Sequence, residues 1–296
     1  MSTMRLTQNM MVGRSQSAVQ VALGRLASAQ EQLSTGKRLN RPSDSPTDTT
    51  SAMRLRASLK AVDQYARNAS DGLGRLAVAD QTLFGVTDLV SRAKEIALEG
   101  ANTGASDQNA RDALATEVDQ IRAELVNQAN TQYLTRPVFG GVTAGSQAYD
   151  DNGTFVGVAG AIPRRVGDDV NVDVQVDGRT VFGDGANSVF AELDALSTAL
   201  RAGDSAGVQT SLGELGDRLT TVSTAHANVG AAYKRIEQAQ SSLVDKQLNL
   251  TTSLSDVEDV DLARATIDVS LQQVAYQAAL ASTAKVLQPS LLDFLR

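Results

Sequence analysis

The sequence predicts a mainly α-helical protein. Its N- and C-terminal regions would form a long antiparallel helical coiled-coil rod that carries a small β-rich insertion. Apolar residues recur at alternating spacings of three and four in both terminal regions, as in helices that pack side by side. Between them glycine becomes frequent and valines alternate with polar residues, as in strands. Aromatic residues make up only 4% and tryptophan is absent, so the helices would pack through small side chains.

The composition excludes several classes of protein. The net charge of −7 argues against nucleic-acid binding, which needs a basic face. Without cysteine the chain has no disulfide, no thiolate catalysis and no cysteine-bound zinc. No run of about 18 apolar residues occurs, so we expect no membrane span. The first residues lack the apolar run of a secretory signal, so we expect export, if any, to need no cleaved signal peptide.

The first helix carries a predicted coiled-coil seam and then stops. The seam consists of Val12, Gln16, Val19, Leu23, Leu26, Gln30 and Leu33. Gly36 suits the left-handed position after a helix end, and Lys37 and Arg38 suit the negative end of the helix dipole. Pro42 then prevents the helix from continuing.

A second helix begins directly afterwards. Ser45 is a good N-cap, Pro46 fits the first helical position, and Asp48 lies three residues after the cap, as in a capping box. We expect this helix to reach about residue 99. A turn at 100–106 and a third helix to about residue 131 would follow.

The middle of the chain predicts a small β insertion. Valines alternate with polar residues from Val170 to Val176, and Asp177-Gly178 would form the two-residue turn of a hairpin that returns through 180–182. Weaker strands are expected at 138–139 and 154–158.

Helices return after the insertion. One should run from about residue 187, with Asn187 and Ser188 as caps, to a turn at Gly203, and the next, of about 45 residues, to about 254. The acidic stretch SDVEDVD at 255–261 separates this helix from a last one. The last helix has two adjacent apolar stripes and therefore needs neighbours on several sides.

The pattern predicts three domains that pair the two ends of the chain. Residues 1–45 and 255–296 would form a terminal coiled-coil assembly domain, 46–135 and 187–254 a helical rod domain, and 136–186 a small β-rich domain. The free energy gained by burying five seam side chains is too small to offset the entropy lost by ordering about 30 residues. We therefore expect the ends to be disordered in the free monomer and to become ordered on assembly.

No group of residues predicts catalysis, a metal or a cofactor, so the chain is expected not to be an enzyme. His226, the only histidine, is interpreted as a packing residue. The stretch 150–153 (DDNG) is interpreted as a turn rather than a calcium loop, and the acids at 256–261 as helix caps. The bases at 37–41 fit either a solvated loop or a subunit contact.

Four stretches resemble the flagellin superfamily and, more narrowly, its hook-filament junction proteins. They are 33–46 (LSTGKRLNRPSDSP), 257–263 (VEDVDLA), 275–280 (AYQAAL) and 291–295 (LLDFL). Ser45 stands where that family usually has an aspartate, and the central residues 137–200 are less diagnostic.

This resemblance implies a structural subunit outside the bacterial cell, exported unfolded through the flagellar type III apparatus. Its partners would be copies of itself in a ring or helical layer, the first hook-associated protein, flagellin, and an export chaperone on the C-terminal helix. Flagellin itself is the nearest alternative. A cytosolic coiled-coil binding or regulatory protein is an alternative from another class, and it would keep its termini ordered.

The predicted assembly contacts lie in the two breaks and the two terminal helices. They are Val19, Leu23, Leu26, Leu33, Gly36, Lys37, Arg38, Asn40, Pro42, Asp44, Pro46, Leu271, Val274, Tyr276, Gln277, Leu280, Leu291, Leu292 and Phe294.

Overall fold

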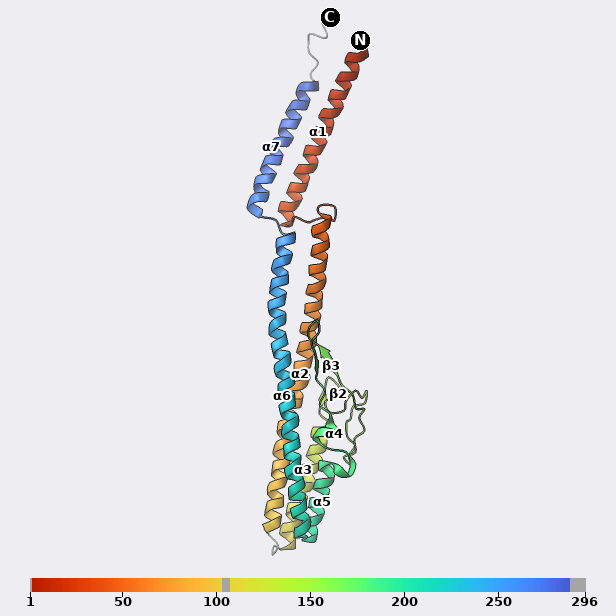
Figure 1. The fold of residues 1–296 in the computed structure, drawn as a ribbon, viewed down its shortest axis with the longest axis vertical. Helices are drawn as coiled ribbons and strands as arrows, with labels where there is room; N and C mark the ends of the chain where they lie inside the picture. Colours follow the sequence, from red (N-terminus) through yellow and green to blue (C-terminus); the bar gives the residue numbers. More distant parts are fainter. Residues whose placement is uncertain (1, 103–106, 288–296) are drawn as a thin grey trace. The chain divides into compact units, whose positions relative to one another are not determined.

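The computed structural model describes residues 2–102 and 107–287, and these residues are mainly helical (Figure 1). They form two compact units. Unit 1 comprises residues 1–61 and 247–296, and unit 2 comprises residues 62–246. The three-domain division predicted from the sequence has other boundaries, since it assigns 46–61 and 247–254 to the rod domain, and it stays a prediction. None of the helices in the described ranges is both long enough and apolar enough to cross a membrane.

Unit 1 is built around a pair of terminal helices. Helix α1 spans Ser2–Thr35 and helix α7 spans Leu262–Leu287, and they run side by side in opposite directions (Figure 1). The unit also contains the start of α2, which spans Pro46–Asn102, and the end of α6, which spans Ser205–Glu258. All four segments meet at the two breaks that the sequence predicts.

The predicted seam of α1 is half right. The less exposed positions of α1 recur every three or four residues: Val12, Ser15, Val19, Ala22, Leu26, Ala29 and Leu33. The predicted seam members Gln16, Leu23 and Gln30 are exposed, and Leu23 keeps 50% of its surface. Two heptad registers share positions 12, 19, 26 and 33. The large apolar side chain of Leu23 led to the prediction of the register that contains it, whereas the less exposed register is the one that contains Ala22. Small residues occupy the intervening positions instead and let the two helices approach closely.

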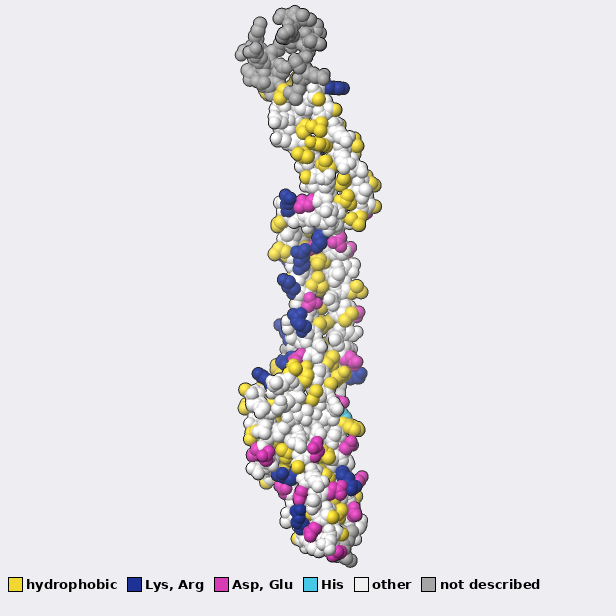
Figure 2. Space-filling view, turned by 180° about the vertical axis from the view of Figure 1, so that it is seen from behind, with side chains coloured by type: hydrophobic (Ala, Val, Ile, Leu, Met, Phe, Trp, Pro, Cys, Tyr) yellow, Lys and Arg dark blue, Asp and Glu magenta, His cyan; other side chains and the backbone are white. Residues whose placement is uncertain are grey.

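Helix α7 has two apolar stripes, as predicted. The stripe of lower exposure contains Ala265, Val269, Gln272, Tyr276, Ala279 and Thr283. The other contains Ile267, Leu271 and Val274, which are 68%, 60% and 63% exposed. Figure 2 shows hydrophobic side chains along the surface of the α1–α7 pair. The second stripe therefore has no cover within the described part of the chain.

Unit 2 contains one continuous hydrophobic core. It lies between α2, α3 (Gln108–Ala129), α5 (Val189–Ala202) and α6, and Leu83, Leu125, Leu193 and Leu215 in it are fully buried. The Ser188 hydroxyl accepts the amide of Ala191 at 3.2 Å and caps α5, as predicted. Gly203 ends α5 with a φ of +69°, also as predicted. Helix α6 is 54 residues long, longer than expected, because it begins directly after that turn.

The insertion contains two small antiparallel sheets. Strand β1 (Gln132–Tyr133) pairs with β2 (Arg136–Pro137), and β3 (Pro163–Arg165) pairs with β4 (Asn171–Asp173). The remaining chain forms helix α4 (Gly178–Val181), a 3-10 turn η1 (Gly185–Asn187) and isolated β-bridges.

The predicted hairpin around Asp177-Gly178 is wrong. The partner of the valine-rich strand lies upstream, since Val172 pairs with Arg164. The Asp177 carboxylate accepts the amide of Arg179 at 3.0 Å and so caps helix α4. Asp177 and Gly178 therefore begin a helix instead of forming the turn of a hairpin. Val181 and Phe182 are then buried in the core rather than placed in a strand. The expected strands at 138–139 and 154–158 are likewise irregular segments, of which the second has only single bridges.

Two helical glycines let the insertion lie against α2. A Cβ at Gly72 would lie 3.2 Å from Val174, and one at Gly74 would lie 2.6 Å from the Tyr133 hydroxyl. Beside them the buried guanidinium of Arg75 donates to the carbonyls of Pro137 and Val138 at 3.1 and 2.8 Å. Burial lowers the pKa of Arg75. The insertion is therefore held against α2 by close backbone approach and by one buried cation.

Candidate functional site

The candidate assembly site is the joint, which we define as residues 34–46 and 255–261. Both stretches lie in unit 1, where α1 gives way to α2 and α6 gives way to α7. Lys37 and Asp259 form an antiparallel bridge. The Arg38 amide donates to the Glu258 carbonyl at 2.7 Å, and the Val260 amide donates to the Gly36 carbonyl at 3.0 Å. The two breaks are thus hydrogen-bonded to each other.

The N-terminal break turns sharply because its residue types favour it. Gly36 has a φ of +68°, which confirms the predicted left-handed position after α1. The Asp44 amide donates to the Arg41 carbonyl at 3.0 Å, and Pro42 occupies the second position of this turn, which proline favours. The Asp44 carboxylate accepts the amides of Asn40 and Arg41 at 3.1 and 2.8 Å. The Asp44 side chain and the Pro42 ring together fix the turn.

The start of α2 confirms the predicted cap. The Ser45 hydroxyl accepts the Asp48 amide at 3.4 Å, and Pro46 is the first residue of the helix. The Asp48 carboxylate forms an ion pair with Arg38 at 3.0 Å. Only half of the expected capping box is therefore present, because the acid is used to tie the break to the helix.

Glu258 is the electrostatic centre of the joint. Its side chain is only 4% exposed, and its carboxylate lies 3.1 Å from the Lys37 ammonium. Arg56 contacts both oxygens, with Nη2 donating to Oε2 at 2.8 Å and Nε lying 2.8 Å from Oε1. Burial alone would raise the pKa of Glu258, but hydrogen bonds from Arg56 and Lys37 outweigh it and lower the pKa below its ordinary value. One buried acid thus links both breaks to α2.

The acidic stretch serves capping, as predicted. The Asp261 carboxylate accepts the amides of Ala263 and Arg264 at 2.9 and 3.2 Å, which caps α7. The Arg38 guanidinium also donates to the Val257 carbonyl at 2.9 Å. Among the residues that the structure describes, no group of His, Cys, Asp or Glu side chains could hold a metal ion. The pairing of the bases at 37–38 with this stretch was not predicted.

The predicted assembly residues separate into four groups. Gly36, Lys37, Arg38, Asn40, Pro42, Asp44 and Pro46 form the joint. Val19, Leu26, Leu33 and Tyr276 lie on the less exposed faces of α1 and α7, whereas Leu23, Leu271, Val274, Gln277 and Leu280 are exposed. Leu291, Leu292 and Phe294 lie outside the described residues. That these residues contact neighbouring subunits stays a prediction.

Sequence reasoning missed Arg56 and Glu258. Arg56 is one of three bases between residues 54 and 60, and nothing in the sequence distinguishes it. Glu258 lies in an acidic run whose members were interpreted as helix caps. A usable signal was the opposite charge of the two stretches of the joint. Three bases lie at 37–41 and four acids at 255–261, and oppositely charged side chains favour pairing across the joint.

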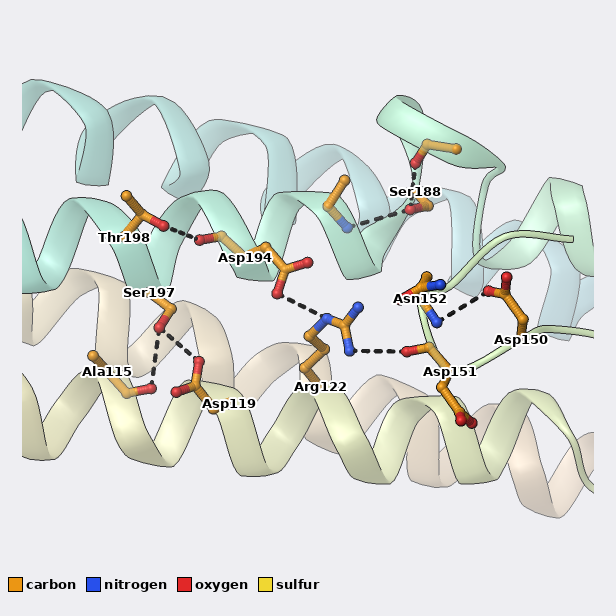
Figure 3. Close-up of polar contacts among 12 residues, drawn as sticks. Ala115, Asp119, Arg122, Asp150, Asp151, Asn152, Ser188, Asp194, Ser197 and Thr198 are labelled. Carbon is orange, nitrogen blue, oxygen red and sulfur yellow. Dashed lines mark hydrogen bonds and ion pairs between the residues drawn. The ribbon is translucent and has the colours of Figure 1, made fainter.

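Other residues singled out in the sequence have structural roles in unit 2. His226 Nε2 lies 2.7 Å from Asp80 Oδ1 and joins α6 to α2, in agreement with the predicted packing role. The DDNG stretch forms the predicted turn, in which the Asp150 carboxylate accepts the amides of Asn152 and Thr154. Arg122 on α3 fastens this turn to α5 by donating to the Asp151 carbonyl and pairing with Asp194 at 2.8 Å (Figure 3).

Paired terminal helices, a closed joint and an apolar stripe without cover are features of a structural subunit that assembles with neighbours. Two family models match the chain. The bacterial flagellin N-terminal helical region matches residues 6–143, and the bacterial flagellin C-terminal helical region matches residues 212–295. These ranges take in most of the chain, which therefore belongs to the bacterial flagellin family.

The similar proteins are flagellar. Flagellar hook-associated protein 3 of Escherichia coli (strain K12) is 28% identical over 84% of this chain and 86% of its own. A flagellin of Halalkalibacterium halodurans is 25% identical over 88% of this chain and 87% of its own. The solved structure of the flagellar junction protein FlgL from Legionella pneumophila has a TM-score of 0.56 at 12% identity, and covers 71% of this chain and 100% of that one. The predicted mainly α fold and the family resemblance are confirmed.

Proposed function

We propose that this chain joins the flagellar hook to the filament. Copies of it would add to the distal end of the hook, on the first hook-associated protein, and present the surface on which flagellin begins. The stretch 33–46, which contains the first part of the joint, supports this placement, because it resembles the junction proteins more narrowly than the flagellins. The relative named hook-associated protein 3 supports it as well. The role is structural, and no enzymatic activity belongs to it.

The outward apolar stripe of α7 is the observation that carries the proposal. Ile267, Leu271 and Val274 stay more than half exposed although α7 already packs against α1. Such a stripe favours association, since burial of each large apolar side chain stabilises a complex by about 1.5–3 kcal/mol. In the flagellum neighbouring subunits would cover it. Export would need no cleaved signal peptide. Before export, a chaperone bound to the C-terminal helix would cover the stripe.

A second candidate function is that of flagellin itself. The likeness to a flagellin of Halalkalibacterium halodurans spans most of both chains and favours it. Flagellin would share the terminal helices and the export route, but it would form long filaments on its own. Purified chain that polymerises into filaments without a hook would support this candidate.

Gold-labelled antibody on intact cells tests the proposal by electron microscopy. A strain that lacks the chain serves as the control for unspecific label. A single gold focus where hook meets filament is the expected result. Label along the whole filament would make the chain a flagellin. No label on the intact cells, with the chain detected in a whole-cell extract, would contradict both functions.

A further inference from the structure

The two units differ strongly in charge. Unit 1 has 12 Lys and Arg against 9 Asp and Glu, a net charge of +3. Unit 2 has 15 against 25, a net charge of −10. Figure 2 shows Lys and Arg side chains gathered where α2 begins. Oppositely charged surfaces on one chain attract each other between copies.

The positive surface is the basic face, which we define as Arg54, Ala57 and Lys60 of α2. These residues follow one another at intervals of three along the helix, and all three are exposed. Within the described chain neither Arg54 nor Lys60 forms an ion pair, whereas Arg56 beside them is held by Glu258. Two unpaired cations therefore flank an alanine, which leaves a helix face that can approach another surface closely.

The negative surface is the acidic groove between α5 and α6 on unit 2. Two adjoining hollows of about 390 and 550 Å³ share Ala195 and Glu214 in their walls. Most of the other wall residues are alanine, glycine, serine or threonine. Because these side chains are small, they leave room for a helix of another molecule to approach the groove.

The acids of the groove differ in what they contact. Glu192 is paired with Arg218, and Asp194 with Arg122. Asp204, Glu214 and Asp217 have no cationic partner in the described chain. Among the described residues the groove thus presents three carboxylates without an ion-pair partner, of which Asp204 accepts the Ala206 amide at 3.1 Å.

We infer that the basic face of one copy docks in the acidic groove of a second copy. Charge complementarity selects this occupant: within the described chain, two cations without an ion pair flank a small residue on one surface, and three acids without an ion pair line a small-residue groove on the other. Because the two surfaces are different patches of the same chain, one such contact per pair of copies is head-to-tail and repeats into a ring or a helical layer. Exposed ion pairs are individually weak, so the contact fixes orientation more than affinity.

This inference rests on the proposed function, in which copies form a layer at the end of the hook. Sedimentation velocity of the full chain tests it at about 50 mM and about 500 mM salt. We expect concentration-dependent association at low salt and a roughly tenfold weaker association at high salt, because salt screens exposed charges. Association through the apolar stripe of α7 would not weaken with salt, and that result would overturn the inference.

A charge swap tests which surfaces meet. One variant carries Arg54→Glu and Lys60→Glu, and the other carries Glu214→Lys and Asp217→Lys. Each variant alone should stay monomeric at low salt, since both of its surfaces then have the same sign. An equimolar mixture should associate as the wild type does. A mixture that stays monomeric would overturn the inference.

The matched control is Lys234→Glu with Arg235→Glu, which changes the charge of α6 by the same amount away from both surfaces. It should associate normally, and far-UV circular dichroism should show that all variants keep their helices. Failure of this inference is distinguishable from failure of the proposed function. Gold label along the whole filament together with a successful charge swap would reject the junction role and keep the head-to-tail contact.

Discussion

The terminal helix pair of unit 1 and the core of unit 2 are built from similar helices but are buried to very different degrees. Around the unit 2 core, Leu83, Leu125 and Leu215 have no exposed surface. Among the described side chains of α1 and α7, Leu26, Ala265 and Val269 alone are buried, and each of them keeps some exposure. The amount of burial, and not helix length, decides which helices are stable in a single chain. We therefore expect unit 2 to be stable in the single chain and the terminal pair to depend on neighbours.

The largest expected difference between the two regions appears when one leucine in each is truncated to alanine. Leu83→Ala should lower the free energy of unfolding by about 2–5 kcal/mol, because it opens a cavity in a closed core. Leu26→Ala, the same truncation in α1, should change it by less than about 0.5 kcal/mol in the monomer, because we expect the terminal pair to open independently of the unit 2 core. Urea unfolding followed by circular dichroism measures both. Equal losses would show that the terminal pair contributes to monomer stability.

Hydrogen exchange sharpens the same comparison. If the terminal helices are marginal alone, amides of α1 and α7 should exchange quickly in the monomer, whereas core amides near Leu125 and Leu215 should be protected by the full free energy of unfolding. The predicted disorder of the ends in the free chain is tested by this measurement. Slow exchange along α1 would contradict it.

Glu258→Gln is expected to have an intermediate effect, confined to unit 1. The exposed partners Lys37 and Arg56 limit the loss, so we expect roughly tenfold less protection of the Arg38 and Val260 amides, or about 1.4 kcal/mol. The control Glu31→Gln removes an exposed pair with Arg41 and should change protection little.

The pH dependence of the joint follows from the same carboxylate. Because the folded pKa of Glu258 lies below its ordinary value of 4.5, its contribution is present above that value and is lost as pH falls through the folded pKa. Protection of the joint amides should therefore fall in acid for the wild type and stay flat for Glu258→Gln. An identical acid loss in the variant would assign it to another group.

A pair of glycine variants in α2 is expected to have effects of opposite sign on the stability of unit 2. Gly74→Ala should destabilise the docked insertion by about 1–3 kcal/mol, since its Cβ would displace the Tyr133 hydroxyl. Gly85→Ala in the same helix meets nothing nearer than 3.8 Å and should stabilise it by about 0.5–1 kcal/mol. Thermal unfolding of both variants measures the difference. Stabilisation by both would mean that the insertion does not depend on this close approach.

Much of the fold could be predicted because local signals fixed the helix ends. Gly36, Ser45, Pro46, Ser188 and Gly203 act in the structure as their residue types suggest. What failed depended on partners distant in sequence. The register of α1 was ambiguous between Ala22 and Leu23, and the strand containing Val172 could pair upstream or downstream. The joint illustrates both cases, since its turns were predictable while the Glu258 pairing, over about 200 residues, was not.

The smallest expected effect on stability concerns the prolines of the joint. Pro42→Ala and Pro46→Ala keep the turn bonds of Asp44 and the cap of Ser45, so each should cost the monomer only about 0.4–1 kcal/mol through the entropy of the unfolded chain. Assembly should suffer more, because a joint that samples other turns presents α1 and α7 to neighbours in many directions. Swimming of a complemented strain should therefore fall while the melting temperature hardly changes. The control Pro163→Ala, in strand β3 of unit 2, should leave swimming intact. A joint variant that lowers the melting temperature but swims normally would show that the prolines serve folding and not assembly.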